Sequence, residues 1–269
     1  MSKSELDALR ARKFRSARTI GALILREMTT TYGRTPGGYL WALLEPIGAV
    51  AMITLVLGTG LRLRSPSLGT SFVLFYATGM LTYLMYHRVQ VKVAKSLTFS
   101  RPLLFYPGVT YVDTIIARFF LNGLTQCMAF GLVIAGILTI FDTRAVLDVP
   151  PILTAMAMSL SLALGIGSFN AFLMPRFPLW ESVWSILTAP LFLISGIFYT
   201  YEDLPDLGQT ILWYNPIIHA VAVMRRGFYP SYDATWASPL YVFALSMICL
   251  FLGIVFLGRY HRDIINQDF

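Results

Sequence analysis

Polar side chains inside otherwise apolar runs carry the most distinctive chemistry of this sequence. Trp41 and Glu45 stand four positions apart at the start of the first such run, which places them on one face of a helix. A carboxylate at that depth is costly against lipid, so it predicts a transport pathway or a buried pair. The alternative is a Glu side chain that reaches the nearby headgroups.

Tyrosines follow in the second apolar run. Tyr76, Tyr83 and Tyr86 lie seven and then three positions apart, close to one helical face. A hydroxylated aromatic face suits a sliding sugar chain, because the C–H groups of sugar rings pack on it. The alternative is the aromatic belt of membrane interfaces, which is the better interpretation for Tyr86.

A polar stripe marks the third run, where Arg118, Asn122 and Gln126 repeat every four positions. Lipid excludes such a face, so the stripe must meet another helix or water. Arg118 is a candidate for the pathway. It is equally a candidate for an ion pair with Asp113 or Glu45.

A shorter apolar segment near the end of the chain contains Asn215-Pro216 and His219, with Arg225 just beyond it. An apolar run of about 10 to 14 residues is too short to cross a membrane, and irregular backbone at that depth survives only against protein or water. We therefore predict a re-entrant helical hairpin over residues 204–224, with these four residues in an external lid. A structural turn with solvated charges is the alternative.

The elements that position these residues must lie in lipid. Of the 269 residues, 56% are hydrophobic and only 13% are charged, against about 25% charged in ordinary soluble domains. This composition argues against a soluble enzyme. No Gly-rich segment ends in Gly-Lys-Ser or Gly-Lys-Thr, so any ATP must be hydrolysed by a partner. We expect no metal, cofactor or nucleic acid on this chain.

The sequence predicts an all-α integral membrane protein with six spans, since a spanning helix needs ~20 mostly apolar residues. Of the 21 Lys and Arg residues, 16 fall on the side of the N-terminus, so both termini are predicted to be cytoplasmic. In the fourth run, Gly165 and Gly167 belong to four-residue repeats of small residues, which predict close packing. The six runs cover residues 39–61, 71–86, 114–141, 151–174, 184–199 and 240–258.

Two cytoplasmic segments accompany these spans. Residues 17–32 have an amphipathic helical pattern and are predicted to lie on the inner leaflet, where Glu27 projects into the apolar face and needs a basic partner. The loop of residues 87–113 is interpreted either as positive charge beside anionic lipid or as a short coupling helix. Its candidate coupling residues are Lys92, Lys95, Leu97, Phe99 and Arg101.

Several blocks recur in an order and spacing typical of one family. They are Arg26-Glu27 with Thr31-Tyr32-Gly33-Arg34, residues 38–46, residues 113–118, and residues 212–219 followed by Arg225. These blocks closely resemble permease subunits of bacterial polysaccharide-export ABC transporters. They are most similar to the capsule exporters of Gram-negative bacteria.

The resemblance implies an inner-membrane homodimer with the translocation channel between two six-span subunits. It also implies a separate dimeric ATP-binding subunit that holds ATP and Mg, a periplasmic envelope-spanning export protein, and a lipid-linked acidic polysaccharide as cargo. Residues 1–38 then form a tail and interface helix, and residues 39–269 form the permease domain. The interface-helix candidates are Arg26, Glu27, Tyr32 and Arg34, and the pathway candidates are Trp41, Glu45, Tyr76, Tyr83 and Arg118.

Other functions share parts of this pattern. An exporter of O-antigen or teichoic-type glycans has the same architecture, and an exporter of small hydrophobic compounds predicts a narrower, less aromatic interior. A membrane-embedded sugar transferase would need clustered carboxylates beside a cavity. The intramembrane region offers only Glu45, Asp113 and Glu181 for that purpose, so we expect a transport subunit rather than an enzyme.

Overall fold

The structure is a computed structural model that describes residues 15–32, 40–56, 66–106, 108–143 and 145–266. Every regular element in these ranges is helical, which confirms the all-α prediction for the described part of the chain. The elements are α2 (Arg15–Tyr32), α3 (Leu40–Ile53), α4 (Phe72–Ala94), α5 (Ser96–Leu104), α6 (Tyr111–Ile140), α7 (Val149–Arg176), α8 (Trp180–Thr188), α9 (Leu191–Ile194), η2 (Tyr201–Asp203), α10 (Asp206–Leu212), α11 (Pro216–Arg226) and α12 (Pro239–Asn266).

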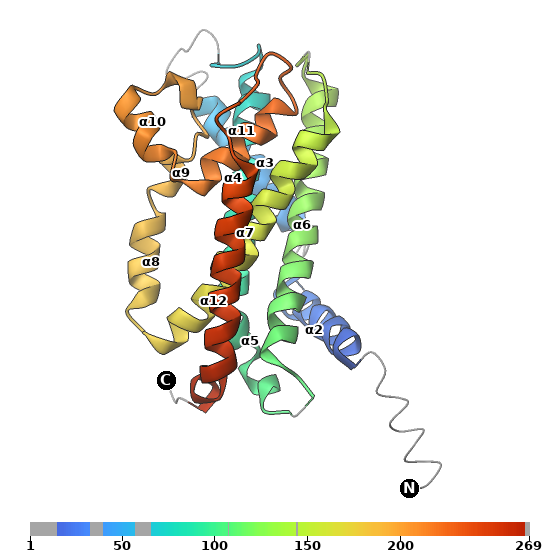
Figure 1. Ribbon diagram of the computed structural model, residues 1–269. Coiled ribbons are helices and arrows are strands. Elements are labelled where there is room, and N and C mark those ends of the chain that lie inside the picture. The colour runs from blue at the N-terminus through green and yellow to red at the C-terminus, as the bar shows by residue number, and fades with distance from the viewer. Residues whose placement is uncertain (1–14, 33–39, 57–65, 107, 144, 267–269) are drawn as a thin grey trace, which may run out of the picture.

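The helices form one elongated bundle with two different ends (Figure 1). Helices α2 and α5 and the end of α12 lie at one end, whereas α10 and α11 lie at the other. Within the described ranges, three helices, α6, α7 and α12, are long and apolar enough to cross a membrane. The 30 residues of α6 reach about 45 Å at 1.5 Å per residue, against a hydrocarbon core of about 30 Å. The third, fourth and sixth predicted runs therefore form helices of spanning length.

The other three predicted runs form helices that are shorter or less apolar. Helix α3 occupies most of the described part of the first run, and α4 continues to Ala94 rather than ending near residue 86. The fifth run is divided between α8 and α9, with a turn at Ala189-Pro190, because proline cannot supply the N–H that a continuous helix needs. A layout of six complete spans stays a prediction.

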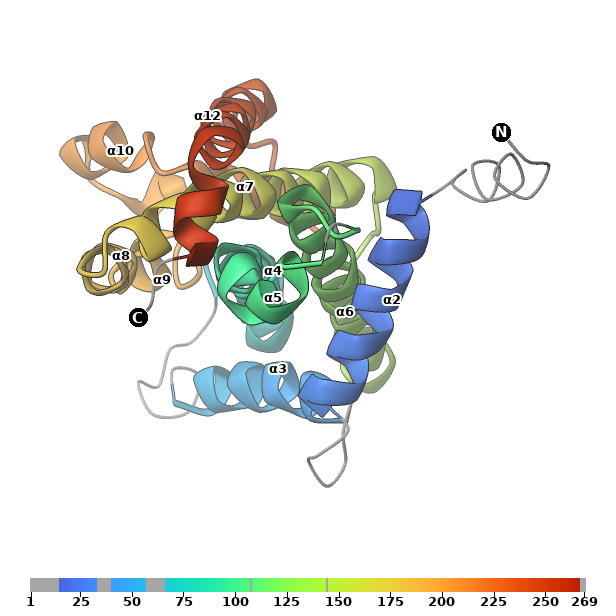
Figure 2. The same cartoon turned by 90° about the horizontal axis from the view of Figure 1, so that it is seen from below.

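Helix α4 lies at the centre of the bundle and contacts α3, α6, α7 and α11 (Figure 2). Helix α7 packs along both α4 and α12. A Cβ atom on Gly165 would lie 2.2 Å from the carbonyl oxygen of Ser246 on α12, and one on Gly167 would lie 2.7 Å from Cβ of Val93 on α4. The close packing predicted for these small residues is confirmed.

Two helices, α10 and α11, lie where the sequence predicts a re-entrant hairpin, and they differ in burial. Helix α11 is buried from Ile217 to Arg225 and packs against α4 and α7. Helix α10 has no buried residue and projects away from the bundle at the same end (Figure 1). The depth of this hairpin in a membrane stays a prediction.

Candidate functional site

Glu27 and Arg118 form a buried ion pair at the α5 end of the bundle. Glu27 Oε2 lies 3.2 Å from Arg118 Nε, and the two side chains are only 4% and 6% exposed. Asn122 Nδ2 donates a hydrogen bond to Glu27 Oε1 at 3.4 Å. The basic partner expected for Glu27 is therefore Arg118, and the pair joins α2 to α6.

The same guanidinium holds the connection between α4 and α5. Arg118 Nη1 donates to the carbonyl oxygens of Lys92 at 3.0 Å and Lys95 at 3.2 Å. Arg118 Cζ lies 3.9 Å from the centre of the Phe99 ring, and Arg26 Cζ lies 5.4 Å from it, both within cation–π range. The junction cluster is the name used below for Arg26, Glu27, Phe99, Arg118 and Asn122.

Arg118 pairs with neither partner considered from the sequence. Asp113 caps α6, since its Oδ2 accepts from the Thr110 N–H at 3.0 Å and its own N–H donates to Thr110 Oγ1 at 3.2 Å. Glu45 pairs instead with Arg88 Nη2 at 2.8 Å. Both suggested pairings are therefore wrong. Asp113 is the third residue of its helix, where a carboxylate serves the helix N-terminus.

The junction cluster combines residues that the sequence assigned to three separate sites. Glu27 and Arg26 come from the predicted interface helix, Phe99 from the coupling segment, and Arg118 from the predicted pathway. Arg118 lies in this cluster rather than beside Trp41 or the tyrosines. The side chain of Tyr32, and Arg34 altogether, lie outside the described residues.

The predicted apolar anchors of the coupling segment face the bundle. Leu97 is 2% exposed, and Phe99 lies against the Arg118 guanidinium. The apolar side chains exposed just beyond α5 are Phe105 and Tyr106, at 61% and 63%. Sequence analysis did not single out this pair, because it selected only residues up to Arg101 in this loop.

The basic residues of the coupling segment lie closer to the surface. Lys95 is exposed, and its Nζ lies 2.6 Å from Glu181 Oε1 on α8. Lys92 and Arg101 are half-buried. The contact from Lys95 to α8 was not predicted, because no spacing in the sequence relates the two segments.

Trp41 and Glu45 lie on an exposed face of α3. Trp41 is 56% exposed, and the side chain of Glu45 is 69% exposed although it pairs with Arg88. The ion pair of Glu45 and Arg88 joins α3 to α4. The pathway role of Trp41 and Glu45 stays a prediction.

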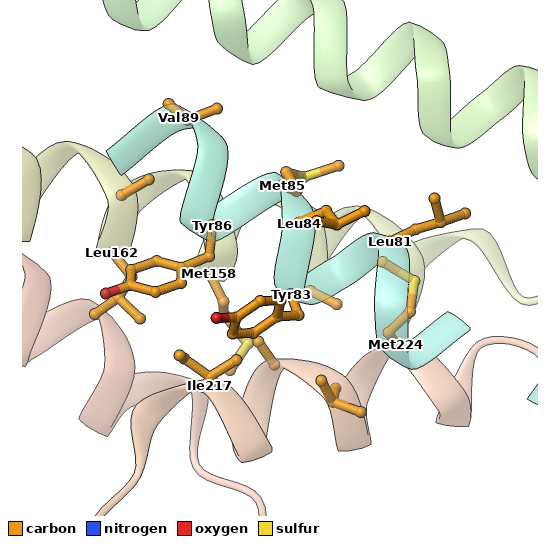
Figure 3. Close-up of a cluster of buried hydrophobic side chains, with 14 of the residues drawn as sticks. Leu81, Tyr83, Leu84, Met85, Tyr86, Val89, Met158, Leu162, Ile217 and Met224 are labelled. Atoms are coloured by element: carbon orange, nitrogen blue, oxygen red, sulfur yellow. The ribbon is translucent and has the colours of Figure 1, made fainter. Parts of the chain in front are cut away.

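Tyr83 and Tyr86 point from α4 into the hydrophobic core. Figure 3 shows them beside Met158, Leu162 and Ile217. Tyr83 is 6% exposed and Tyr86 is 2% exposed. Other helices enclose Tyr86, which therefore does not face a membrane interface.

Tyr76 and Tyr83 are covered by phenylalanines that follow α8. The Phe198 ring centre lies 6.3 Å from that of Tyr76, and Phe192 meets Tyr83 edge-on at 5.4 Å. Tyr76 is 2% exposed. The two tyrosines do not border open space in this arrangement, so a pathway role requires this cover to move.

Asn215 and Pro216 form the start of α11. Asn215 Oδ1 accepts from the Ile217 N–H at 3.0 Å, and Pro216 occupies the first helical position, where a missing N–H leaves no bond unmade. Asn215 Nδ2 donates to Ile194 O and to Ser195 Oγ, each at 3.2 Å. The dipeptide is therefore a helix N-terminus that also binds the segment after α9.

His219 is enclosed by aromatic rings. Its Nε2 lies 2.7 Å from the carbonyl oxygen of Trp213, which can only accept, and its Nδ1 accepts from the Ser238 N–H at 3.1 Å. These bonds match one neutral tautomer. The ring centres of Trp213, Trp236 and Tyr241 lie 5.1 to 5.4 Å away. His219 therefore ties α11 to the segments on either side of it.

Arg225 is a buried cation at the α10 end. Its Nη1 donates to Tyr199 O at 2.7 Å and its Nη2 to Ile197 O at 2.9 Å, while Cζ lies 3.9 Å from the Phe75 ring centre. Among the residues that the structure describes, no carboxylate comes within ion-pair distance of Arg225. Neutral acceptors and one ring face therefore hold this charge.

The three long apolar helices α6, α7 and α12 are those of an integral membrane protein, and buried contacts fix both ends of its helical bundle. The described residues contain no group of three or more His, Cys, Asp or Glu that could hold a metal ion. Residues 18–229 match the family model of the ABC-2 type transporter, and the chain belongs to that family. It is the multi-pass permease component of an ABC exporter.

Relatives of known function match nearly the whole chain. The capsule polysaccharide export inner-membrane protein CtrC of Neisseria meningitidis serogroup A is 28% identical over 93% of this chain and 94% of its own length. The polysialic acid transport protein KpsM of Escherichia coli is 26% identical over 88% of this chain and 91% of its own length. The capsule polysaccharide export inner-membrane protein BexB of Haemophilus influenzae is 26% identical over 93% of this chain and 94% of its own length. The family resemblance seen in the sequence is confirmed.

Proposed function

We propose that this permease exports a lipid-linked capsular polysaccharide across the bacterial inner membrane. It works as a homodimer that encloses the channel, with a separate ATP-binding subunit dimer and a periplasmic envelope-spanning export protein. The observation that carries the choice of cargo is the near full-length match to proteins named for capsule polysaccharide export and polysialic acid transport. A match over 88% to 93% of the chain includes both ends of the bundle and the hairpin.

The ATP-binding subunit docks at the end of the bundle that holds α5. Basic residues of α5 and its flanks gather at this end, as the positive-inside rule requires of a cytoplasmic face. Phe105 and Tyr106 supply exposed apolar surface there. Both termini are cytoplasmic in this orientation, since α2 and the end of α12 lie at the same end (Figure 1).

The junction cluster transmits the movement of α5. Arg118 holds the carbonyl oxygens of Lys92 and Lys95 and the carboxylate of Glu27. A displacement of α5 by the ATP-binding subunit therefore moves α2 and α6 with it. Buried side chains that are packed and bonded in this way carry force better than exposed ion pairs, which exchange readily with water.

A second copy of the chain covers the exposed face of α3. Leu40, Trp41 and Leu44 are 50% to 61% exposed on this helix, and the charged pair of Glu45 and Arg88 lies beside them. An ion pair is costly in contact with lipid. This mixture of apolar and charged side chains favours a protein-lined, wet boundary for α3.

Deletion and purification test this function. Deleting the gene in its source organism should remove the surface polysaccharide, and supplying the intact chain should restore it. The tagged chain, purified in mild detergent, should elute as a dimer with an ATPase and an envelope-spanning protein. Normal surface polysaccharide after deletion would contradict the proposal, as would ATPase activity that responds to hydrophobic drugs and not to glycan.

A further inference from the structure

The segment that covers Tyr76 and Tyr83 is a distinct feature, here named the strap and defined as residues 191–199. It contains α9 and the residues that follow, with Gly196 in a left-handed conformation at φ +74°. Its Phe192 and Phe198 lie 5.3 Å apart between ring centres and cover Tyr83 and Tyr76, respectively.

Asn215 and Arg225, near the two ends of α11, bind the strap through three backbone carbonyl oxygens and one side-chain hydroxyl. Asn215 Nδ2 donates to Ile194 O and to Ser195 Oγ. Arg225 donates to Ile197 O and Tyr199 O. The strap is therefore held by four hydrogen bonds from two side chains, at its middle and at its end.

The surface beneath the strap is shaped for close approach. A Cβ atom on Gly79 of α4 would lie 3.0 Å from Ile197 Cα and 3.2 Å from Arg225 Nη2. Gly79 stands between Tyr76 and Tyr83 in the same helix. The backbone of the strap thus rests directly on the tyrosine face of α4.

We propose that the strap is a displaceable cover, and that Asn215 and Arg225 hold it over a saccharide-binding face formed by Tyr76 and Tyr83. This inference rests on the proposed function, because it takes sugar rings as the ligand of the tyrosines. The covered state is the resting state. During transport the strap leaves α4, the four hydrogen bonds to the strap break, and sugar rings pack on the tyrosines in place of Phe192 and Phe198.

The properties of the two holding residues fit a reversible contact. Arg225 is bonded to neutral carbonyl oxygens rather than to a carboxylate, so the release of the strap separates no pair of opposite charges. Asn215 keeps its bond to the Ile217 N–H when the strap leaves, so α11 stays capped. Helix α11 can therefore remain packed while the strap moves.

A reversible disulfide tests whether the strap must move. Ser195→Cys with Asn215→Cys, in a chain with Cys127 and Cys249 replaced by Ala, puts a thiol on each of two side chains that are in direct contact, since Asn215 Nδ2 lies 3.2 Å from Ser195 Oγ. Oxidation should lower export of surface polysaccharide about tenfold or more, and reduction should restore it. The matched control is Ser161→Cys with Ser246→Cys, whose native hydroxyl oxygens are 3.4 Å apart and which joins α7 to α12. Export through the oxidised control should persist.

Labelling provides a second measurement that does not depend on cargo. A cysteine replacing Tyr83 lies beneath Phe192, so a membrane-impermeant maleimide should label it slowly in the resting complex. Adding Arg225→Met should raise the labelling rate about tenfold, because two of the four bonds to the strap are lost. Arg225→Lys, which keeps a donor, should raise it less.

The outcomes separate the strap from the proposed function. Export through the oxidised strap disulfide, or labelling that is unchanged by Arg225→Met in a chain that still assembles, would overturn the strap proposal and leave the exporter intact. Failure of the unmodified chain to restore surface polysaccharide to a deletion strain would count against the proposed function. Labelling would still report on the strap in that case.

Discussion

Arg118 and Arg225 are two buried arginines in similar surroundings at opposite ends of the bundle. Each guanidinium lies 3.9 Å from the centre of a phenylalanine ring, Phe99 for Arg118 and Phe75 for Arg225. Each also donates to two backbone carbonyl oxygens of a neighbouring segment. They differ in one respect, since Arg118 has a buried carboxylate partner, Glu27, and Arg225 is bonded to neutral acceptors.

This difference distinguishes a fixed joint from a releasable contact. Removing one partner of a buried ion pair costs about 3–5 kcal/mol, because a charge is left without compensation. A hydrogen bond to a charged group contributes about 1.5–3 kcal/mol, and the carbonyl it frees can bind water instead. The junction cluster should therefore stay assembled through a transport cycle, while the contact of Arg225 with the strap can break.

The largest effect is expected for Glu27→Ala. The substitution leaves the Arg118 charge buried and should lower the free energy of unfolding by about 3–5 kcal/mol. Thermal unfolding of the purified protein in detergent measures it. The double variant Glu27→Leu with Arg118→Met removes both charges and should recover most of the loss. An equal loss in single and double variants would show that packing, and not charge, holds the junction cluster.

A smaller and more local effect is expected for Arg225→Met. The substitution removes two hydrogen bonds to the strap, but it also removes a buried charge that is costly to desolvate, so the net destabilisation of the external end should be about 1.5–3 kcal/mol. Hydrogen exchange should speed up about tenfold or more in residues 195–199, since about 1.4 kcal/mol corresponds to a factor of ten. Exchange in α5 should not change. Faster exchange at both ends would remove the distinction between the two arginines.

The sequence predicted which residues of each site need a contact better than it predicted which residues supply that contact. The unfavourable position of Glu27 in an apolar face already required a basic partner, and the break at Asn215-Pro216 already placed a turn between two helices. Both signals are local, because they depend on periodicity and on proline chemistry. They identify a residue that needs a contact without naming the contact.

The pairings came from helix packing, which no spacing in the sequence encodes. Arg118 was assigned to the pathway because polar stripes in spans meet water or other helices, and the structure selects the second. Tyr76 and Tyr83 share a face as predicted, yet the strap that covers them belongs to a run predicted as a continuous span. Because of the turn at Ala189-Pro190, the second half of that run lies over Tyr76 and Tyr83. A hydropathy pattern does not predict the direction that the chain takes after such a turn.

Alanine substitutions at two glycines test the contact between the strap and α4, with a smaller expected effect on stability. A Cβ atom on Gly79 would lie 3.0 Å from Ile197 Cα, whereas one on Gly131 of α6 would meet no atom within 4 Å. Gly79→Ala should therefore displace the strap at a cost of about 1–3 kcal/mol. Gly131→Ala should be neutral or should stabilise α6 by up to about 1 kcal/mol. Thermal unfolding gives both values, and equal effects would show that the strap does not rest on Gly79.

The smallest expected effect is a loss of local stability at low pH. It arises at Asp203, in the segment that directly follows the strap. Burial alone would raise the pKa of the Asp203 carboxyl, but hydrogen bonds from Thr200 and Ser67 and the charge of Arg225 lower it below its ordinary value. Asp203 Oδ2 accepts from the Thr200 N–H at 2.9 Å. A carboxyl group with a lowered pKa stabilises the folded state fully above its unfolded value of about 3.9. This contribution is lost as the pH falls through the lower folded value.

Hydrogen exchange of residues 200–203, corrected for the intrinsic pH dependence, should therefore be constant from neutral pH to about pH 4 and should rise below it. Asp203→Asn removes the titrating group and should abolish that rise, since the amide oxygen still accepts a bond from the Thr200 N–H at every pH. A rise that persists in Asp203→Asn would assign the acid sensitivity to another group. A rise confined to the unchanged chain would show that the Asp203 carboxylate helps to fix the end of the strap, so that both charges near it, Asp203 and Arg225, act through neutral backbone groups.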